Sequence, residues 1–201
     1  MTRFHLIRHG AHGLLGRVLT GRMPGVALDA RGRVQAADLA AALAARPIAA
    51  VVSGPLQRAR ETAEPIAARL GRDVRVEPEV DDIEFGAWTG VAFDALDADP
   101  AWRAWNAHRS TAPTPGGETM LAVQARALAA LLRLRREHAG AELAVVSHAD
   151  VVKAVLAHFL GVPLDLMHRI EVSPGSRSVL TVFDEDARVE AMNLPPRTAS
   201  A

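Results

Sequence analysis

Short apolar runs alternate along the chain with longer segments in which apolar residues recur at helical spacing. The short runs predict buried strands at 4–7, 48–52 and 143–146 and a shorter edge strand at 73–76. The helical spacing predicts helices over 30–45, 55–70, 118–139 and 150–160, with two short helices over 92–108 that break at Asp99-Pro100. Residues 178–183 and 189–192 predict a closing hairpin, and 195–201 a frayed tail.

This alternation of strands and helices predicts right-handed βαβ units. We therefore expect an α/β fold, a three-layer α/β/α sandwich with a mainly parallel mixed sheet whose antiparallel edge is the C-terminal hairpin. Residues 1–194 show neither an internal repeat nor a linker, so they are expected to form one domain, with 91–115 as an excursion from the sheet that could cap a pocket.

Apolar residues at helical spacing also predict which helix faces point inward. The inward faces expected for two of the helices consist of Val34, Ala37, Leu39, Ala41 and Leu43, and of Leu121, Ala125, Leu128, Leu131, Leu132 and Leu134. Pro55 suits the first position of the helix over 55–70. Arg58 falls in the first turn of that helix and off its apolar stripe, where the free N–H groups of a helix start favour an anion.

Polar, chemically active residues stand directly after three of the predicted strands. Arg8-His9 follows the first strand, Ser53 the second with Arg58 nearby, and Ser147-His148 the last buried run. In a parallel sheet the carboxyl ends of the strands share one edge, and ligands bind there. An arginine binds a phosphate as a fork and a histidine can act on it, so the sequence predicts a phosphoryl-transfer site.

Two further segments could complete this site. The glycine-rich loop over 11–25 directly follows the predicted pocket, and we expect it to supply substrate contacts through Thr20, Gly21 and Arg22. The acidic stretch Asp81-Asp82-Ile83-Glu84 lies beside Phe85 and Trp88, and a carboxyl group in such surroundings can act as a general acid.

Composition excludes several other functions. Acidic and basic residues cancel at 23 each, so no basic excess points to nucleic acid or to an anionic membrane. The chain has no cysteine, which excludes disulfides and thiolate catalysis. Polar residues interrupt the N-terminal apolar run and no apolar run reaches the length of a membrane span, so a cytoplasmic protein is expected.

Five segments, in order, resemble the histidine phosphatase superfamily, which is phosphoglycerate-mutase-like. They are Leu6-Ile7-Arg8-His9-Gly10, the stretch from Val52 to Ala63, the stretch from Asp82 to Gly90, Pro115-Gly116-Gly117-Glu118-Thr119 and Val145-Val146-Ser147-His148. The Arg-His-Gly triplet alone would be a weak signal, but the ordered set covers most of the chain.

The resemblance implies a role for each matched residue. His9 would be the nucleophile that forms a phosphohistidine, and Arg8, Arg58 and His148 would hold the phosphoryl oxygens, beside Gly10. Alignment on Phe85-Gly86-x-Trp88 places the family's catalytic acid at Asp82. The resemblance implies neither a metal nor an organic cofactor.

Glu84 remains a rival to Asp82 as the general acid, and it is also a candidate substrate contact. In an extended segment both side chains point to the same side, so periodicity cannot separate them. The chain also departs from the family pattern: Ala11-His12 stands where Glu-Thr is common, Leu15 where an asparagine is usual, and Ala149 in place of a frequent glycine.

The interpretation that these residues favour is a phosphomonoester hydrolase that acts on a small phosphorylated metabolite or phosphoprotein. The alternatives are a mutase that returns the phosphoryl group to another hydroxyl, a non-catalytic module that binds a phosphorylated ligand, and a metallohydrolase using His5 and His9. A small-molecule phosphate ester is the expected partner, and the sequence leaves open whether the chain forms a homodimer.

Overall fold

The structure, a computed structural model, describes residues 1–196 and is built around one six-stranded sheet. Its strands, in chain order, are β1 (Thr2–Arg8), β2 (Ile48–Ser53), β3 (Val74–Val76), β4 (Glu142–Ser147), β5 (Arg177–Val182) and β6 (Ala187–Leu194). The order across the sheet is β3-β2-β4-β1-β5-β6. The first four strands pair in parallel and the hairpin β5–β6 adds an antiparallel edge, as predicted.

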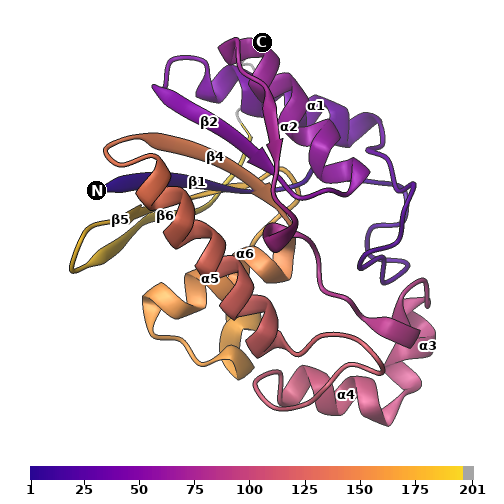
Figure 1. Cartoon of the computed structure of the whole chain (residues 1–201). Coiled ribbons are helices and arrows are strands. Elements are labelled where there is room, and N and C mark those ends of the chain that lie inside the picture. The colour runs from indigo at the N-terminus through magenta and orange to yellow at the C-terminus, as the bar shows by residue number, and fades with distance from the viewer. Residues whose placement is uncertain (197–201) are drawn as a thin grey trace.

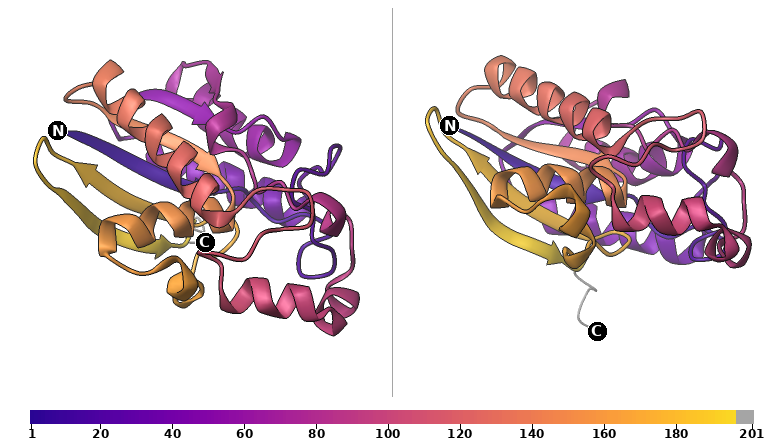
Figure 2. Two further views of the ribbon diagram at one scale, coloured as in Figure 1. Left: turned by 60° about the horizontal axis from the view of Figure 1, so that its bottom comes forward. Right: turned by 90° about the horizontal axis from the view of Figure 1, so that it is seen from below.

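Helices cover both faces of this sheet (Figures 1 and 2). The helices are α1 (Ala30–Leu43), α2 (Gln57–Leu70), α3 (Phe93–Ala98), α4 (Pro100–Ala107), α5 (Met120–Glu137) and α6 (Ala149–Leu160). Short 3₁₀ helices are η1 (Pro78–Val80), η2 (Gly86–Trp88) and η3 (Leu164–Arg169). The pair α1 and α2 packs on one face and the pair α5 and α6 on the other, which confirms the predicted α/β sandwich.

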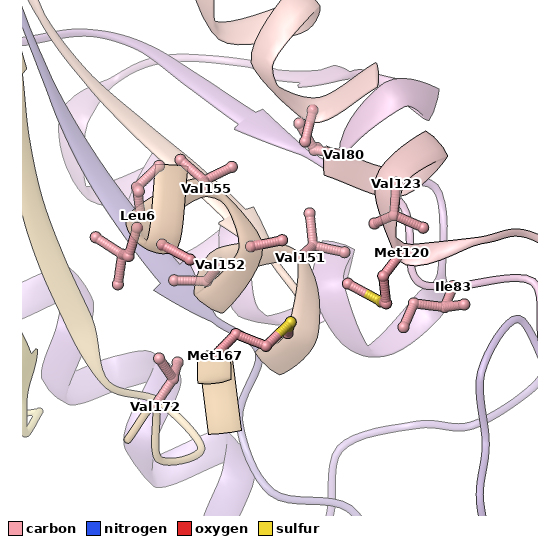
Figure 3. Packing of buried hydrophobic residues seen from close by; sticks show 14 of the residues in the cluster. Leu6, Val80, Ile83, Met120, Val123, Val151, Val152, Val155, Met167 and Val172 are labelled. Carbon is pink, nitrogen blue, oxygen red and sulfur yellow. The ribbon is translucent and has the colours of Figure 1, made fainter. Parts of the chain in front are cut away.

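The alternation of side chains along the strands divides the core between these two faces. Ile7 of β1 packs with Leu39 and Ile66 in the cluster under α1 and α2. Its neighbour Leu6 points the other way, where Figure 3 shows it beside Val152 of α6. Because β1 lies inside the sheet and is buried on both faces, it is largely apolar apart from His5, and this is why the sequence located it.

The predicted inward faces of two helices are partly wrong. Val34 of α1 is 60% exposed, and Leu121 and Leu132 of α5 are 58% and 40% exposed. The buried stripes are instead Gln35, Ala36, Leu39, Ala40 and Leu43 on α1 and Met120, Val123, Ala127, Ala130, Leu131 and Leu134 on α5. Alanines alternate with large residues on both stripes and let the helices approach the sheet closely, so the largest apolar residues alone did not mark the buried side.

Helix boundaries follow local capping signals, with one correction. The side chains of Asp29 and Thr119 accept hydrogen bonds from the first turns of α1 and α5 and fix where these helices begin. Pro55 does not open α2, which begins at Gln57 with Leu56 as its N-cap residue. Most of the predicted tail at 195–201 lies outside the described residues.

The segment between the acidic stretch and α5 forms the two short helices α3 and α4, broken at Asp99 as predicted. Figure 1 shows them beyond the end of the sheet toward which β1 runs. Trp88, Trp102 and Trp105 pack together there, with ring centroids 5.2–6.1 Å apart, and fix this segment to the body of the protein. Among residues 1–196 the helices are all too short or too polar to cross a membrane.

Candidate active site

The carboxyl ends of β1, β2 and β4 meet at one edge of the sheet, as the sequence predicts. The backbone N–H of His9 donates to the carbonyl oxygen of Ser147 over 2.9 Å, and this bond joins the ends of β1 and β4. The rings of His9 and His148 lie with their centroids 5.1 Å apart. His9 and His148, which directly follow β1 and β4 and are 139 residues apart in sequence, are therefore neighbours at this edge of the sheet.

The turn after His9 is held in place by the start of α1 and by α2. The N–H of Gly10 donates to the Thr62 hydroxyl of α2 over 3.0 Å. A Cβ atom on Gly10 would lie 2.7 Å from the carbonyl oxygen of Gly32 in α1, closer than real Cβ contacts. Glycine is needed here because the two backbones touch, and the contact fixes where the His9 ring points.

Hydrogen bonding defines which nitrogen of His9 is free. Its Nδ1 lies 2.8 Å from the carbonyl oxygen of Gly10, which can only accept, so Nδ1 carries the proton. Burial lowers the pKa of His9 well below its ordinary value, and the nearby His148, Arg58 and Arg8 lower it further. At neutral pH the imidazole is therefore uncharged, with a free lone pair on Nε2.

Arg58 lies inside the protein rather than outside the core, which corrects the sequence-based expectation. Its side chain is fully buried on α2, and its Nη2 donates to the carbonyl oxygen of Gly21 over 2.6 Å and to Asp82 Oδ2 over 2.9 Å. A buried guanidinium stays charged and needs partners for its five N–H groups. Periodicity assigns a charged residue off the apolar stripe to the surface of a helix. Arg58 is buried instead because Gly21 and Asp82, which belong to loops, contact its guanidinium group.

Several buried nitrogen atoms around His9 have no hydrogen-bond partner in the described part of the chain. They are Arg8 Nε, Arg58 Nε and Nη1, His12 Nδ1 and His148 Nε2. A buried polar group without a partner costs free energy, and each such group in a native structure needs an explanation. Together these nitrogens form a set of donors whose natural partners are the oxygen atoms of an anion.

Asp82 is the carboxylate closest to these groups. Its Oδ2 lies 2.9 Å from Arg58 Nη2 and 3.2 Å from His148 Nδ1. Burial alone would raise the pKa of Asp82, but the neighbouring His148 and Arg58 outweigh it and lower the pKa below the usual range of an aspartate. Asp82 is thus ionised in the unliganded protein and neutralises part of the positive charge of the site.

A cavity of about 370 Å³ opens above this site. Five of the predicted site residues line it, namely Arg8, His9, Thr20, Gly21 and Asp82. Arg58 and His148 contact Asp82, and Gly10 contacts His9, so all three adjoin the lining residues. The volume lies within the range of pockets that enclose small-molecule ligands.

Arg22 and Glu84, two other predicted contacts, do not line the cavity. Arg22 Nε donates to the backbone oxygen of Asp82 over 2.9 Å, and its Nη2 pairs with Glu118 over 2.9 Å. Glu84 Oε1 accepts a hydrogen bond from the N–H of Gly86 over 3.3 Å. Both side chains hold the acidic segment in shape, and the structure thereby separates Asp82 from Glu84, which periodicity could not do.

The site also contains two side chains that the sequence raised with less emphasis, His12 as a replacement for the contact missing at Leu15 and Asp81 as one of three candidate general acids. His12 is 4% exposed and lines the cavity, with its ring centroid 5.4 Å from that of His9. Burial, with help from Arg58 and Arg8, lowers the pKa of His12 to about 4, so this imidazole is also neutral. Asp81 is buried too, with its Oδ1 3.5 Å from His148 Nε2.

His5 does not belong to the site. It is the central residue of β1, and its Nε2 lies 2.9 Å from Oε2 of Glu142, the first residue of β4. Across residues 1–196, no three His, Cys, Asp or Glu side chains are placed to hold a metal ion. The metallohydrolase alternative, which paired His5 with His9, therefore has no geometric support.

Comparison with known proteins agrees with this geometry. A sequence profile of the histidine phosphatase superfamily (branch 1) matches residues 4–195. An uncharacterized protein of Mycobacterium tuberculosis is 42% identical over 154 residues, 73% of each chain. The glucosyl-3-phosphoglycerate phosphatase of the same species is 32% identical over 173 residues, 81% of this chain and 77% of the relative.

A solved structure shares the fold throughout. The structure of Bacillus stearothermophilus YhfR superposes with a TM-score of 0.89 at 28% identity and covers 96% of this chain and 98% of its own. Every residue that lines the cavity falls within residues 4–195, the range that the family profile matches.

Proposed function

Because the chain belongs to the histidine phosphatase superfamily, we propose that it hydrolyses phosphate monoesters of small metabolites through a phosphohistidine on His9. The observation that carries the proposal is the set of buried, unpartnered nitrogens of Arg8, Arg58 and His148 around a neutral histidine at the floor of a cavity. Similarity to a phosphatase supports the same reaction.

The first step is transfer of the phosphoryl group. Nε2 of His9, free because Nδ1 is bonded to Gly10, attacks phosphorus as the bond to the ester oxygen breaks. The non-bridging oxygens accept hydrogen bonds from Arg8, Arg58 and His148, whose N–H groups are already in place to stabilise the transition state. The product of this step is a phosphohistidine and an alcohol.

The second step is hydrolysis, and both steps need a proton to move. Asp82 gives a proton to the leaving oxygen in the first step and takes one from the attacking water in the second, so the enzyme returns to its starting state. The Arg22 side chain holds the backbone of Asp82 and is a positioning residue in this scheme.

The alternatives make different use of the same pocket. A mutase must hold a second hydroxyl of the product against the phosphohistidine, and a binding module needs no nucleophile. A neutral, buried His9 with one nitrogen fixed by a hydrogen bond favours catalysis over binding alone. We also propose that residues 1–194 act as one domain in the cytoplasm.

Activity should survive removal of metal ions and be abolished by vanadate. The transferred group is held by cationic side chains, and vanadate can take the same five-coordinate geometry at His9. The test is turnover of a panel of phosphate monoesters by protein dialysed against EDTA, with and without vanadate. Activity that returns only when zinc or magnesium is added would overturn the proposal, and binding of esters without any turnover would favour the binding module.

Replacing Arg58 by lysine should lower kcat by roughly a hundredfold to a thousandfold, the cost of losing a preorganised charged donor. Lysine retains the positive charge but lacks Nε and Nη1, the two nitrogens without a protein partner. Alanine is the poorer test, because removal of a fully buried side chain also leaves a cavity and an unpaired Gly21 carbonyl.

The matched control is Arg60→Lys, two residues further along the same helix. Arg60 is half exposed and pairs with Glu64 over 3.5 Å on the outer face of α2. This variant should have normal kcat and normal thermal stability. Near-normal turnover in Arg58→Lys would show that Arg58 serves the fold alone.

A further inference from the structure

The wall of the cavity above the phosphoryl site is built from two segments that are far apart in sequence. The backbones of residues 17–19 and 90–93 are joined by hydrogen bonds between Leu19 N and Val91 O over 2.9 Å and between Phe93 N and Arg17 O over 3.0 Å. An isolated bridge between Val18 and Ala92 lies between them. The loop that follows His9 is therefore fixed to the start of α3, and the wall has a defined shape.

Apart from His12 and Thr20, the side chains that this loop and the facing segment present to the cavity are apolar. Leu15, Val18 and Leu19 come from the loop, and Phe85 and Phe93 come from the acidic segment and α3. Phe93 is backed by Trp102, with ring centroids 6.2 Å apart. Leu15, Val18 and Phe93 are only half buried in the protein, so a ligand in the cavity would cover the rest of their surface.

The charges on the lining disfavour a second anionic group. Among the described residues that line the cavity, Arg8 is the one lysine or arginine, and it belongs to the phosphoryl site. Besides Asp82, the acidic residue on the lining is Asp150, whose carboxylate already pairs with Arg109 over 2.8 Å. Arg17 in the loop is exposed and does not line the cavity.

Resting on the proposed function, we infer that the substrates are phosphate monoesters of uncharged alcohols that place an apolar face against Leu15, Val18 and Phe93. An ester whose alcohol carries a carboxylate would bury that charge against apolar side chains and near Asp150, with no free cation to pair with it. An uncharged aliphatic or aromatic group would instead gain from burial against the same wall.

Three nearly isosteric alkyl esters test this inference: 3-methylbutyl phosphate, 3-phosphonooxypropanamide and 3-phosphonooxypropanoate. The end of the alkyl group is apolar in the first ester, polar and uncharged in the second, and negatively charged in the third. All three release an alkyl alcohol. We expect kcat/KM to fall in that order and to be at least about tenfold lower for the carboxylate than for the 3-methylbutyl ester, as for other small changes in an apolar pocket. Equal values, or a preference for the carboxylate, would overturn the inference.

Leu15→Lys places a cation on the wall and should raise kcat/KM for the carboxylate ester. The ratio of kcat/KM for the 3-methylbutyl ester to kcat/KM for the carboxylate ester should therefore become smaller. The matched control is Leu14→Lys, which adds the same charge one residue away at a half-buried position that does not line the cavity. It should leave the ratio unchanged. Asp150→Asn provides a second test independent of the loop, because it removes the negative charge and releases Arg109, and it should narrow the ratio as well.

The outcomes separate the two proposals. Absence of turnover for all three esters and for p-nitrophenyl phosphate overturns the proposed function and this inference with it. Turnover of all three esters at equal rates leaves the phosphatase intact and overturns the substrate class alone. An unchanged ratio in both Leu15→Lys and Asp150→Asn, with both proteins folded by circular dichroism, overturns the assignment of the wall.

Discussion

Turnover of every phosphate monoester is expected to fall by on the order of 10⁴-fold when His9 is replaced by asparagine, because the reaction loses its nucleophile. Asparagine can keep the hydrogen bond to the Gly10 carbonyl through its amide, so the turn after β1 should survive. The variant should also fail to take up label from a ³²P-labelled ester when the reaction is quenched after a short time.

The label itself distinguishes His9 from its neighbours. In the unmodified protein the labelled group should be acid-labile and map to His9. The His12→Asn variant is the matched comparison, since His12 is also buried and neutral and its ring lies 5.4 Å from that of His9. It should still form a phosphohistidine at His9. Label on His148, or full turnover by His9→Asn, would refute the assignment.

The architecture could be predicted from the sequence because the signals for its strands are local. β1 and β4 are buried on both faces, so the sequence of each is a largely apolar run followed by a polar residue at the carboxyl end. The meeting of Arg8-His9 with Ser147-His148 then follows from parallel pairing alone, and the register of β1 with β4 places Arg8 opposite Ser147.

Features that depend on a tertiary contact could not be predicted in the same way. The burial of Arg58 depends on Gly21 and Asp82, which reach it from loops 37 and 24 residues away. The roles of Arg22 and Glu84 also depend on tertiary structure. Their residue types suit a substrate contact, but Arg22 bonds the carbonyl oxygen of Asp82 and Glu84 bonds the N–H of Gly86. The predicted inward faces of α1 and α5 are partly wrong for a different reason. Alanines make up much of their buried stripes, so the large apolar residues alone do not mark the buried side.

Asp82 presents an apparent conflict, because a general acid must carry a proton and the neighbours of this carboxyl group lower its pKa. The balance of causes resolves it. Burial favours the protonated form of Asp82, and the interactions with His148 and Arg58, followed by the hydrogen bond from the N–H of Ile83, reverse that preference. A phosphoryl group bound at the floor of the cavity would bring its own negative charge next to Asp82 and would share Arg58 and His148 with it through their unpartnered nitrogens. The pKa of Asp82 should then rise, and the proton becomes available where the ester oxygen leaves.

Dependence on the leaving group tests this role. An alkyl phosphate releases a strongly basic oxygen that needs a proton, whereas p-nitrophenolate leaves without one. We therefore expect Asp82→Asn to slow alkyl esters by about 10²–10⁴-fold, the usual contribution of general acid catalysis, and to affect p-nitrophenyl phosphate far less. A structural defect would slow both classes of ester alike and would lower the melting temperature.

Glu84→Gln is the control for that experiment, because Glu84 belongs to the same segment, is also partly buried and does not line the cavity. Its side chain bonds the N–H of Gly86, and a glutamine oxygen can accept the same bond. Glu84→Gln should therefore hydrolyse alkyl and nitrophenyl esters at rates near those of the unmodified protein. If Glu84→Gln shows the selective loss on alkyl esters and Asp82→Asn does not, the two carboxyl groups must exchange roles, and the acidic segment must rearrange when substrate binds.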